Sequence, residues 1–185
     1  MSTVRPASIE DAPGIGFVSV TAWRETYAGI MPDDYLASLS IDQRTELFRG
    51  RIANLPPKQA IFVALDDNER VVGFGVSGAA REPELGTDGE IFAINIVDAA
   101  KRKGFGVRLM TAMADALLRC SFNSVGLWVV EQNYPARRFY EVLNGNRTTQ
   151  KDQDFGNKTL IELGYTWATV ADLAKSAARL VDRTG

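Results

Sequence analysis

The stretch Lys101-Arg102-Lys103-Gly104-Phe105-Gly106 separates an apolar segment, residues 90–97, from a segment whose apolar residues recur at helical spacing. This pattern predicts a strand that turns directly into a helix. Two glycines permit a tight turn and leave backbone amides uncovered by side chains. Such amides, together with the positive end of the helix dipole and three adjacent cations, favour an anion. We therefore expect a phosphorylated ligand at this turn.

Two well-known nucleotide-binding motifs do not match this turn. A P-loop ends in Gly-Lys-Ser/Thr, which the stretch lacks. A dinucleotide-binding fingerprint needs a third glycine where Leu109 stands. Taken alone, the stretch is also compatible with a plain glycine-containing turn whose lysines are solvated.

Strands and helices alternate on both sides of this turn. The strands are predicted from short apolar or alternating runs bounded by turn residues, at 3–6, 60–65, 71–77, 90–97, 125–130, 147–152 and 159–167. Helices are predicted from Ser8 to Tyr27, from Asp33, from Ser40 to before Pro56, over 107–117, over 135–143 and over 169–182. The order predicts a single α/β (α+β) domain, with a mixed central sheet of six to seven strands flanked by helices and an extra C-terminal helix.

Composition limits the function classes. The 185 residues carry 21 Lys+Arg and 23 Asp+Glu, so the chain lacks the basic excess of a nucleic-acid-binding protein. Because there is no histidine and one cysteine, histidine-based nucleophile systems and structural zinc sites are excluded. No basic leader and no apolar run of about 18 residues is present, so we expect a cytoplasmic protein that does not associate with a membrane.

A second motif, Asn133-Tyr134-Pro135-Ala136-Arg137-Arg138-Phe139-Tyr140-Glu141, follows the strand at 125–130. Together the two segments resemble motif A, Q/R-x-x-G-x-G/A, and motif B, N-x-x-A-x-x-F-Y-x-x-x-G, of the GNAT superfamily of acetyl-CoA-dependent N-acyltransferases. The resemblance covers about residues 3–167. It departs at Lys101, where the family has Gln or Arg, and at Asn144, where it has glycine. Since Gly145 is adjacent, we expect the turn to shift by one residue.

The resemblance implies a GNAT-like N-acetyltransferase domain over residues 1–167 and a helical extension over 168–185, with acetyl-CoA as cosubstrate and no metal. It implies that the parallel strands 90–97 and 125–130 splay apart to admit the pantetheine arm of the cofactor. The residues expected to bind the cofactor are Ile96, Val97, Arg102, Lys103, Gly104, Phe105, Gly106, Val107, Asn133 and Ala136.

Two residues match catalytic positions of the family. Tyr140 is expected to be the general acid and Glu90 a base acting directly or through water. Packing beside Phe139 is the alternative for Tyr140, and a solvated strand-edge carboxylate is the alternative for Glu90. Asn133 is expected to combine cofactor contact with capping of the following helix. Tyr27 and Tyr35 are expected to border the acceptor pocket.

The predicted function is transfer of an acetyl group to a primary amine of a small molecule or peptide by direct attack. A non-catalytic acyl-CoA-binding or sensor module on the same fold is the alternative. The C-terminal helix carries an apolar stripe that must be covered, either by its own domain or by a second subunit in a homodimer.

Overall fold

The computed structural model describes residues 3–181, which form a seven-stranded sheet in the order β1-β2-β3-β4-β5-β7-β6. Within these residues β4 and β5 are the parallel pair, and every other neighbouring pair is antiparallel. The strands are β1 (Thr3–Pro6), β2 (Ala60–Leu65), β3 (Val71–Ala79), β4 (Gly89–Ile96), β5 (Val125–Val130), β6 (Asn146–Phe155) and β7 (Lys158–Trp167). The predicted mixed sheet is therefore confirmed.

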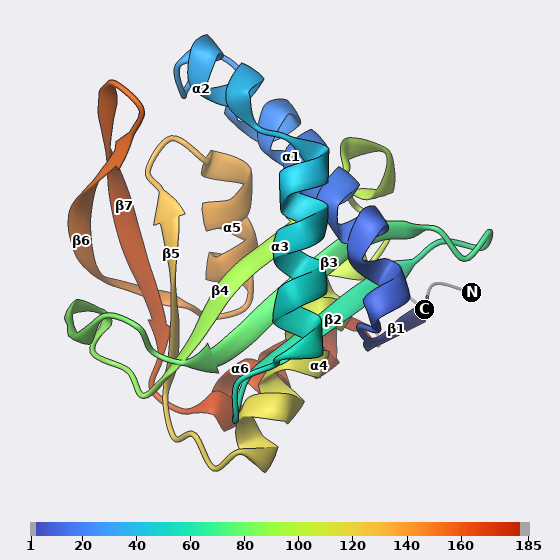
Figure 1. Ribbon diagram of the computed structural model, residues 1–185. Helices are drawn as coiled ribbons and strands as arrows, with labels where there is room; N and C mark the ends of the chain where they lie inside the picture. The colour runs from blue at the N-terminus through green and yellow to red at the C-terminus, as the bar shows by residue number, and fades with distance from the viewer. Residues whose placement is uncertain (1–2, 182–185) are drawn as a thin grey trace.

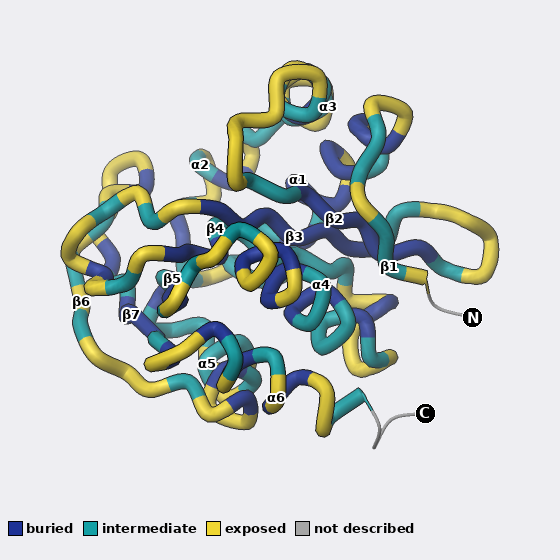
Figure 2. The backbone as a smooth tube through the Cα atoms, turned by 90° about the horizontal axis from the view of Figure 1, so that it is seen from below, coloured by how far each residue is buried: buried dark blue, intermediate teal, exposed yellow. Residues whose placement is uncertain are grey.

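Helices cover both faces of this sheet (Figure 1). On one face α1 (Ala12–Tyr27) packs against α3 (Ile41–Ala53) and the central strands, and α2 (Asp33–Ser38) follows α1. On the other face lie α4 (Phe105–Arg119) and α6 (Val170–Val181), and α5 (Tyr134–Val142) packs into the same core. The burial pattern follows from this arrangement, because β2 and β3 are mostly buried while β6, at the sheet edge, is mostly exposed (Figure 2).

The start of the first helix differs from the prediction. A 3₁₀ turn, η1 (Ile9–Asp11), precedes α1. The carboxylate of Asp11 accepts hydrogen bonds from the backbone N–H and the hydroxyl of Ser8, at 2.7 and 3.0 Å. Ser8 thus opens a tight turn, and α1 begins only at Ala12. The predicted end of the last helix, residue 182, lies outside the described residues.

Asn144 keeps the turn where the family has glycine, so the expected shift by one residue does not occur. Its φ of 62° lies in the left-handed region, which asparagine tolerates better than most residues. Its side-chain amide donates to the hydroxyl of Ser176 at 2.9 Å. A side chain at Gly145 would collide with Trp167, since its Cβ would lie 2.7 Å from the ring.

The apolar stripe of α6 is covered by the chain itself. Helix α6 packs against α4, and Val170, Leu173 and Ala177 are fully buried. The choice that the sequence left open is thus resolved in favour of packing on the same domain. The stripe consequently gives no argument for a second subunit.

Candidate active site

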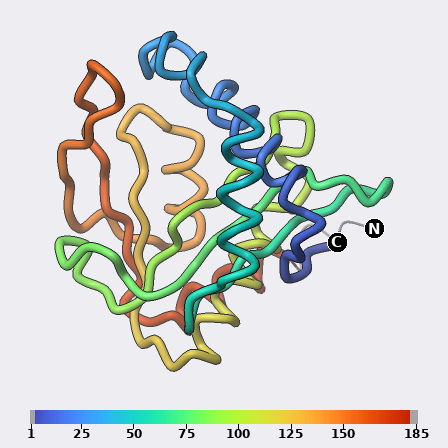
Figure 3. The backbone as a smooth tube through the Cα atoms, in the orientation of Figure 1, coloured from blue at the N-terminus to red at the C-terminus, as the bar shows by residue number. Residues whose placement is uncertain are grey.

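The two parallel strands part immediately after they meet. Their register contains two pairs, Gly89 with Val125 and Glu90 with Gly126. Figures 1 and 3 show β4 and β5 close at this end and separated at the other, with α5 seen in the gap. Although β4 is the fourth of seven strands, it is only half-buried from Phe92 onward. We call this opening the β4–β5 gap.

A β-bulge explains why the strands diverge. Val76 of β3 pairs with Ala93, and the next residue, Ser77, pairs with Ile91, so Phe92 is an additional residue in β4. An extra residue bends a strand and increases its twist. The bend lies directly beyond Glu90, where pairing with β5 ends.

The glycine-containing loop lies at the open end of the gap, after β4. Gly104 is the N-cap of α4 with φ 82°, and Arg102 also has a left-handed backbone, with φ 61°. The N–H of Arg108 is the first in this helix to donate to a backbone carbonyl, that of Gly104, at 3.2 Å. The amides of residues 104–107 therefore have no acceptor within the helix, and they can hold an anion.

Gly106 lies where β4, α4 and α5 meet. A Cβ atom on Gly106 would be 3.4 Å from Cζ of Phe139 and 3.5 Å from Cδ1 of Ile96. These contacts place the glycine at the mouth of the β4–β5 gap. On the opposite edge of β4, the N–H of Val97 donates to the carbonyl of Val72 at 3.1 Å. The carbonyl of Val97 accepts from the N–H of Ala100 at 2.9 Å, so both main-chain polar groups of Val97 already have partners.

The cations of the loop differ in their availability. Lys101 forms an ion pair with Asp98 at 2.6 Å, whereas Arg102 and Lys103 are exposed. The N–H of Asp98 in turn donates to the carboxylate of Glu25 on α1, at 2.8 Å. These contacts anchor the loop to the end of α1.

A cavity lies beside this loop. Its volume is about 870 Å³, and Gly14, Phe17, Asp66, Arg70, Lys103 and Phe105 contribute to its lining. The two adjacent carboxylates of Asp66 and Asp67 border it. Arg70 and Lys103 balance these two charges, so charge does not favour a phosphate in the cavity, whereas the amides of residues 104–107 offer unpaired donors.

Asn133 caps α5, as predicted. Its side-chain oxygen accepts from the N–H of Ala136 at 3.3 Å, and its amide nitrogen lies 3.5 Å from the hydroxyl of Tyr27. Burial raises the pKa of Tyr27, and the nearby carboxylate of Glu162 raises it further. Asn133 thus links the start of α5 to the end of α1.

Tyr140 is buried in α5 among aromatic rings. Its ring centroid is 5.7 Å from that of Phe139, 5.9 Å from that of Tyr165 and 6.5 Å from that of Trp167. Burial raises the pKa of its hydroxyl strongly, and the proximity of Tyr27 adds to the shift. The phenol is therefore neutral, and it keeps its proton at any physiological pH.

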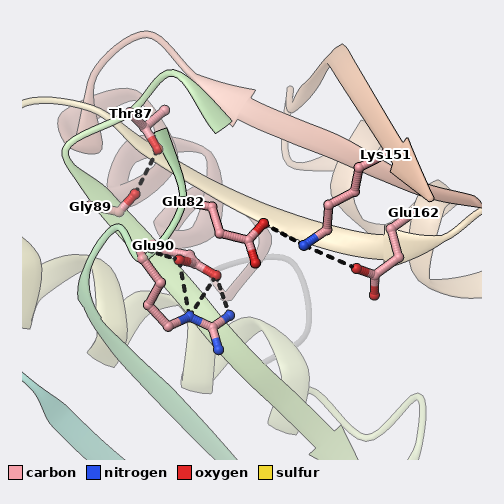
Figure 4. A network of polar contacts seen from close by, with 7 residues as sticks. Glu82, Thr87, Gly89, Glu90, Lys151 and Glu162 are labelled. Atoms are coloured by element: carbon pink, nitrogen blue, oxygen red, sulfur yellow. Dashed lines mark hydrogen bonds and ion pairs between the residues drawn. The ribbon is translucent and has the colours of Figure 1, made fainter. Parts of the chain in front are cut away.

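Glu90 is held by Arg81 at the closed end of the gap (Figure 4). The backbone N–H of Arg81 donates to Oε2 at 2.9 Å, and the guanidinium donates to both carboxylate oxygens. Glu90 is 1% exposed, so it is not the solvated strand-edge residue of the alternative interpretation. The same hydrogen bonds raise the pKa of Arg81.

A second charged group was missed by sequence reasoning. The ammonium of Lys151 on β6 contacts the carboxylate of Glu82 and lies 3.6 Å from that of Glu162 on β7 (Figure 4). It also lies 4.6 Å from the ring centroid of Trp128 on β5. Lys151 and Glu162 are direct cross-strand partners, and opposite charges at facing positions of a predicted hairpin were the available signal.

Tyr35 belongs to an aromatic cluster next to this group. Its ring packs against Phe155 and Trp23, with centroid separations of 5.9 and 6.4 Å, and Trp23 packs on Tyr27 at 5.1 Å. Tyr27 is thus the member that reaches the polar groups, and Tyr35 lies one ring farther away. Tyr35 is therefore the predicted site residue that lies farthest from the β4–β5 gap.

Neither a metal centre nor a membrane span is found in residues 3–181. No cluster of three or more Asp, Glu or Cys side chains there has the geometry to bind a metal ion. None of the helices described is both long enough and apolar enough to cross a bilayer.

Comparison with known proteins identifies the family. The sequence model of the Acetyltransferase (GNAT) family matches residues 20–145. An uncharacterized N-acetyltransferase of Bacillus subtilis, YuaI, is 35% identical over 173 residues, which are 94% of this chain and 96% of that protein.

Solved structures share the fold at lower identity. PaiA N-acetyltransferase of Thermoplasma acidophilum, in complex with coenzyme A, has a TM-score of 0.67 at 22% identity over 90% of this chain and 99% of that one. YncA of Salmonella typhimurium, with its cofactor acetyl-CoA, has a TM-score of 0.67 at 20% identity over 91% of this chain and 94% of that one. The bulged parallel strands, the glycine loop, the family match and the relative agree, and the chain is an acetyl-transferring enzyme of the GNAT acetyltransferase family.

Proposed function

We propose that this chain transfers the acetyl group of acetyl-CoA to a primary amine of a small molecule or peptide. The observation that carries the proposal is the β4–β5 gap ending at a loop with unpaired helix-terminal amides. The gap offers an unpaired strand edge for an amide-containing arm, and the loop offers donors for phosphate. The CoA and acetyl-CoA complexes of two structures with the same fold support this choice of cosubstrate.

In this proposal each part of the cofactor has its own residues. The pyrophosphate lies on the amides of residues 102–107, with Arg102 and Lys103 adding positive charge. The pantetheine arm runs along Ile96 and Val97, next to Gly106 and the start of α5 at Asn133 and Ala136.

The chemistry requires two proton transfers. The acceptor amine is protonated at neutral pH and must lose a proton before its nitrogen can attack the thioester carbon. The departing sulfur then gains a proton to become a thiol. Tyr140 suits the second task, because its phenol is neutral and buried in the core cluster against which Ile94 and Ile96 of β4 pack.

The chain has no histidine, and we assign the first task to a carboxylate. Glu90 is buried, and Glu162 is half-buried, as are Glu82 and Glu131 nearby. Glu90, the residue expected from the resemblance, would act directly or through water while remaining bonded to Arg81. Tyr27 and the aromatic cluster with Tyr35 would border the acceptor.

Thiol release from acetyl-CoA across a panel of primary amines tests the proposal. Release that depends on the amine and matches the amount of acetylated product supports an enzyme of this specificity. Tight binding of CoA without release from any amine would support the sensor module instead. A thermal-shift comparison of CoA, ATP and NAD separates a nucleotide-binding protein, since a ligand of the folded state raises Tm.

Two further properties stay predictions. The single cysteine fits a reducing cytoplasm, and fractionation of the producing cells would test the location. A homodimer would have to use a surface other than the apolar stripe of α6, which is buried against α4. Light scattering of the full chain at micromolar concentration tests this point.

A further inference from the structure

Glu162 lies at the end of the β4–β5 gap opposite to Glu90. It lies opposite Val130, the last residue of β5, and so stands at the open end of the β4–β5 gap, whereas Glu90 stands at the closed end. Strand alternation puts its side chain on the same sheet face as Val130 and Trp128, the face that α1 and α2 cover.

The carboxylate of Glu162 is poorly compensated. Its side chain is 17% exposed, and Lys151, its charged partner, is 3.6 Å away and contacts Glu82 more closely. Burial raises the pKa of Glu162, and the attraction of Lys151 offsets this only partly. Glu82 and Arg81, from the loop before β4, and Tyr27, from α1, are the other titratable groups that act on it. A carboxylate in these surroundings binds protons more readily than one in water.

An electrostatic connection leads from Glu162 to the proposed acid. Tyr27 packs against the apolar cluster that contains Val130, and Val130 is the β5 residue opposite Glu162. In keeping with this packing, Glu162 raises the pKa of Tyr27, and Tyr27 raises that of Tyr140. The hydroxyl of Tyr27 also lies 3.5 Å from the amide of Asn133, the cap of α5. Tyr27 therefore lies between the open end of β5, where Glu162 stands, and the start of α5.

We infer that Glu162 binds the ammonium group of the acceptor and takes its proton, with Tyr27 beside it, while Glu90 fixes the closed end of the gap through Arg81. This inference rests on the proposed function. It assigns the proton acceptor to a residue of β7 that lies outside both sequence motifs.

The step balances as follows. The ammonium gives one proton to the Glu162 carboxylate, which leaves a neutral amine. The amine nitrogen forms a bond to the thioester carbon, and the carbon–sulfur bond breaks with its electron pair on sulfur. The second nitrogen-bound proton passes, by way of Tyr140, to sulfur and gives CoA thiol and the amide. Protonated Glu162 then releases its proton to solvent.

The test compares Glu162→Gln with the matched control Asp152→Asn. Both change a carboxylate to an amide on the β6–β7 hairpin, but Asp152 is exposed and alternates to the opposite side of β6 from Lys151. Each variant is assayed for acetyl-CoA affinity, Tm, and kcat/KM against pH, with an amine that the wild-type chain acetylates. Glu162→Asp, which keeps a shorter carboxylate, is the rescue variant.

We expect Glu162→Gln to keep its affinity for acetyl-CoA and to lose roughly 10²–10⁴-fold in kcat/KM at neutral pH. The kcat/KM of Glu162→Gln should increase only at alkaline pH, where the free amine is neutral in solution. In Glu162→Asp, which keeps a carboxylate, kcat/KM should increase near neutral pH as it does in the wild type. Unchanged kcat/KM in Glu162→Gln, or the same loss in Asp152→Asn, would overturn the inference. If Glu90→Gln moves the pH profile and Glu162→Gln does not, the base is Glu90 and the proposed function stands. If the wild-type chain acetylates no amine, the proposed function itself fails.

Discussion

Glu90 of β4 lies opposite Gly126 of β5, and beyond this pair the two parallel strands are no longer paired. A Cβ on Gly126 would lie 2.8 Å from Cγ of Leu85, so the buried Leu85 packs directly on the strand where a side chain would stand. The bulge at Phe92 bends β4 away just after the pair. The closed end is thus fixed by packing and ion pairing, and the open end is left for ligands.

Replacement of Gly106 by alanine tests the cofactor cradle. The new Cβ would make ordinary contacts of 3.4 and 3.5 Å with Phe139 and Ile96, so the fold should persist. It would occupy space that the proposed cofactor needs beside the loop amides. Loss of one hydrogen bond to a charged group costs about 1.5–3 kcal/mol, so acetyl-CoA affinity should fall about 10–100-fold by calorimetry.

Gly50→Ala is the control for this substitution. Gly50 lies in α3, and no atom would be within 4 Å of its Cβ, so this variant should bind acetyl-CoA like the wild type. Equal acetyl-CoA affinity of the wild type, Gly106→Ala and Gly50→Ala would contradict the placement of the cofactor. Gly104→Val is a poorer test, because its left-handed backbone would be strained by a β-branched residue.

Tyr140→Phe tests the proton donor. The ring would stay packed against Phe139, Tyr165 and Trp167, so Tm and acetyl-CoA affinity should change little. Turnover should fall about 10²-fold, the low end for general acid–base catalysis, because a thiolate is a tolerable leaving group.

Tyr165→Phe provides a matched loss of a buried hydroxyl. Tyr165 donates to Glu141 at 2.7 Å and lies in the same aromatic group, so its removal should lower Tm slightly and leave turnover unchanged. Unchanged turnover in Tyr140→Phe would make Tyr140 a packing residue.

Asp88 joins the two loops at the closed end. Its carboxylate accepts from the N–H groups of Asn123 and Ser124 at 2.9 and 2.7 Å. Partial burial acts against ionisation, but these hydrogen bonds outweigh it and lower the pKa of Asp88 to about 2. Because the folded pKa is depressed, the stabilisation is complete above the ordinary pKa near 4 and is lost as pH falls toward 2.

Asp88→Asn should therefore lower Tm by a few degrees at pH 7, and the difference from wild type should vanish as the pH approaches 2. Thermal unfolding followed by circular dichroism at several pH values measures this. A difference in Tm that is independent of pH over this range would show that the charge of Asp88 is not what stabilises the loops.

Leu173→Ala tests the packing of α6 on α4. Leu173 is fully buried, and truncation of such a leucine costs about 2–5 kcal/mol. Leu118→Ala, at a leucine that is 41% exposed on α4, should cost much less. Urea unfolding of both variants gives the comparison, and equal losses would mean that α6 contributes little to the core.

The sequence was sufficient to predict the strand order along the chain, the glycine loop and the capping role of Asn133, because each depends on local spacing or a local hydrogen bond. Two features depend on contacts between distant residues and were not predicted. Arg81 meets Glu90 only because the loop before β4 folds back, and Lys151 reaches Glu82 across 69 residues. The cover of α6 was likewise undecided, since periodicity reveals an apolar stripe but not its partner.

Amide hydrogen exchange with and without acetyl-CoA tests the central claim most directly, because it locates the bound cofactor on the chain. The account predicts slower exchange on binding for the amides of residues 104–107, and little change at Asp66, Asp67 and Arg70, which border the neighbouring cavity. Protection confined to that cavity, or binding without protection of the loop, would contradict the assignment of the β4–β5 gap as the acetyl-CoA site.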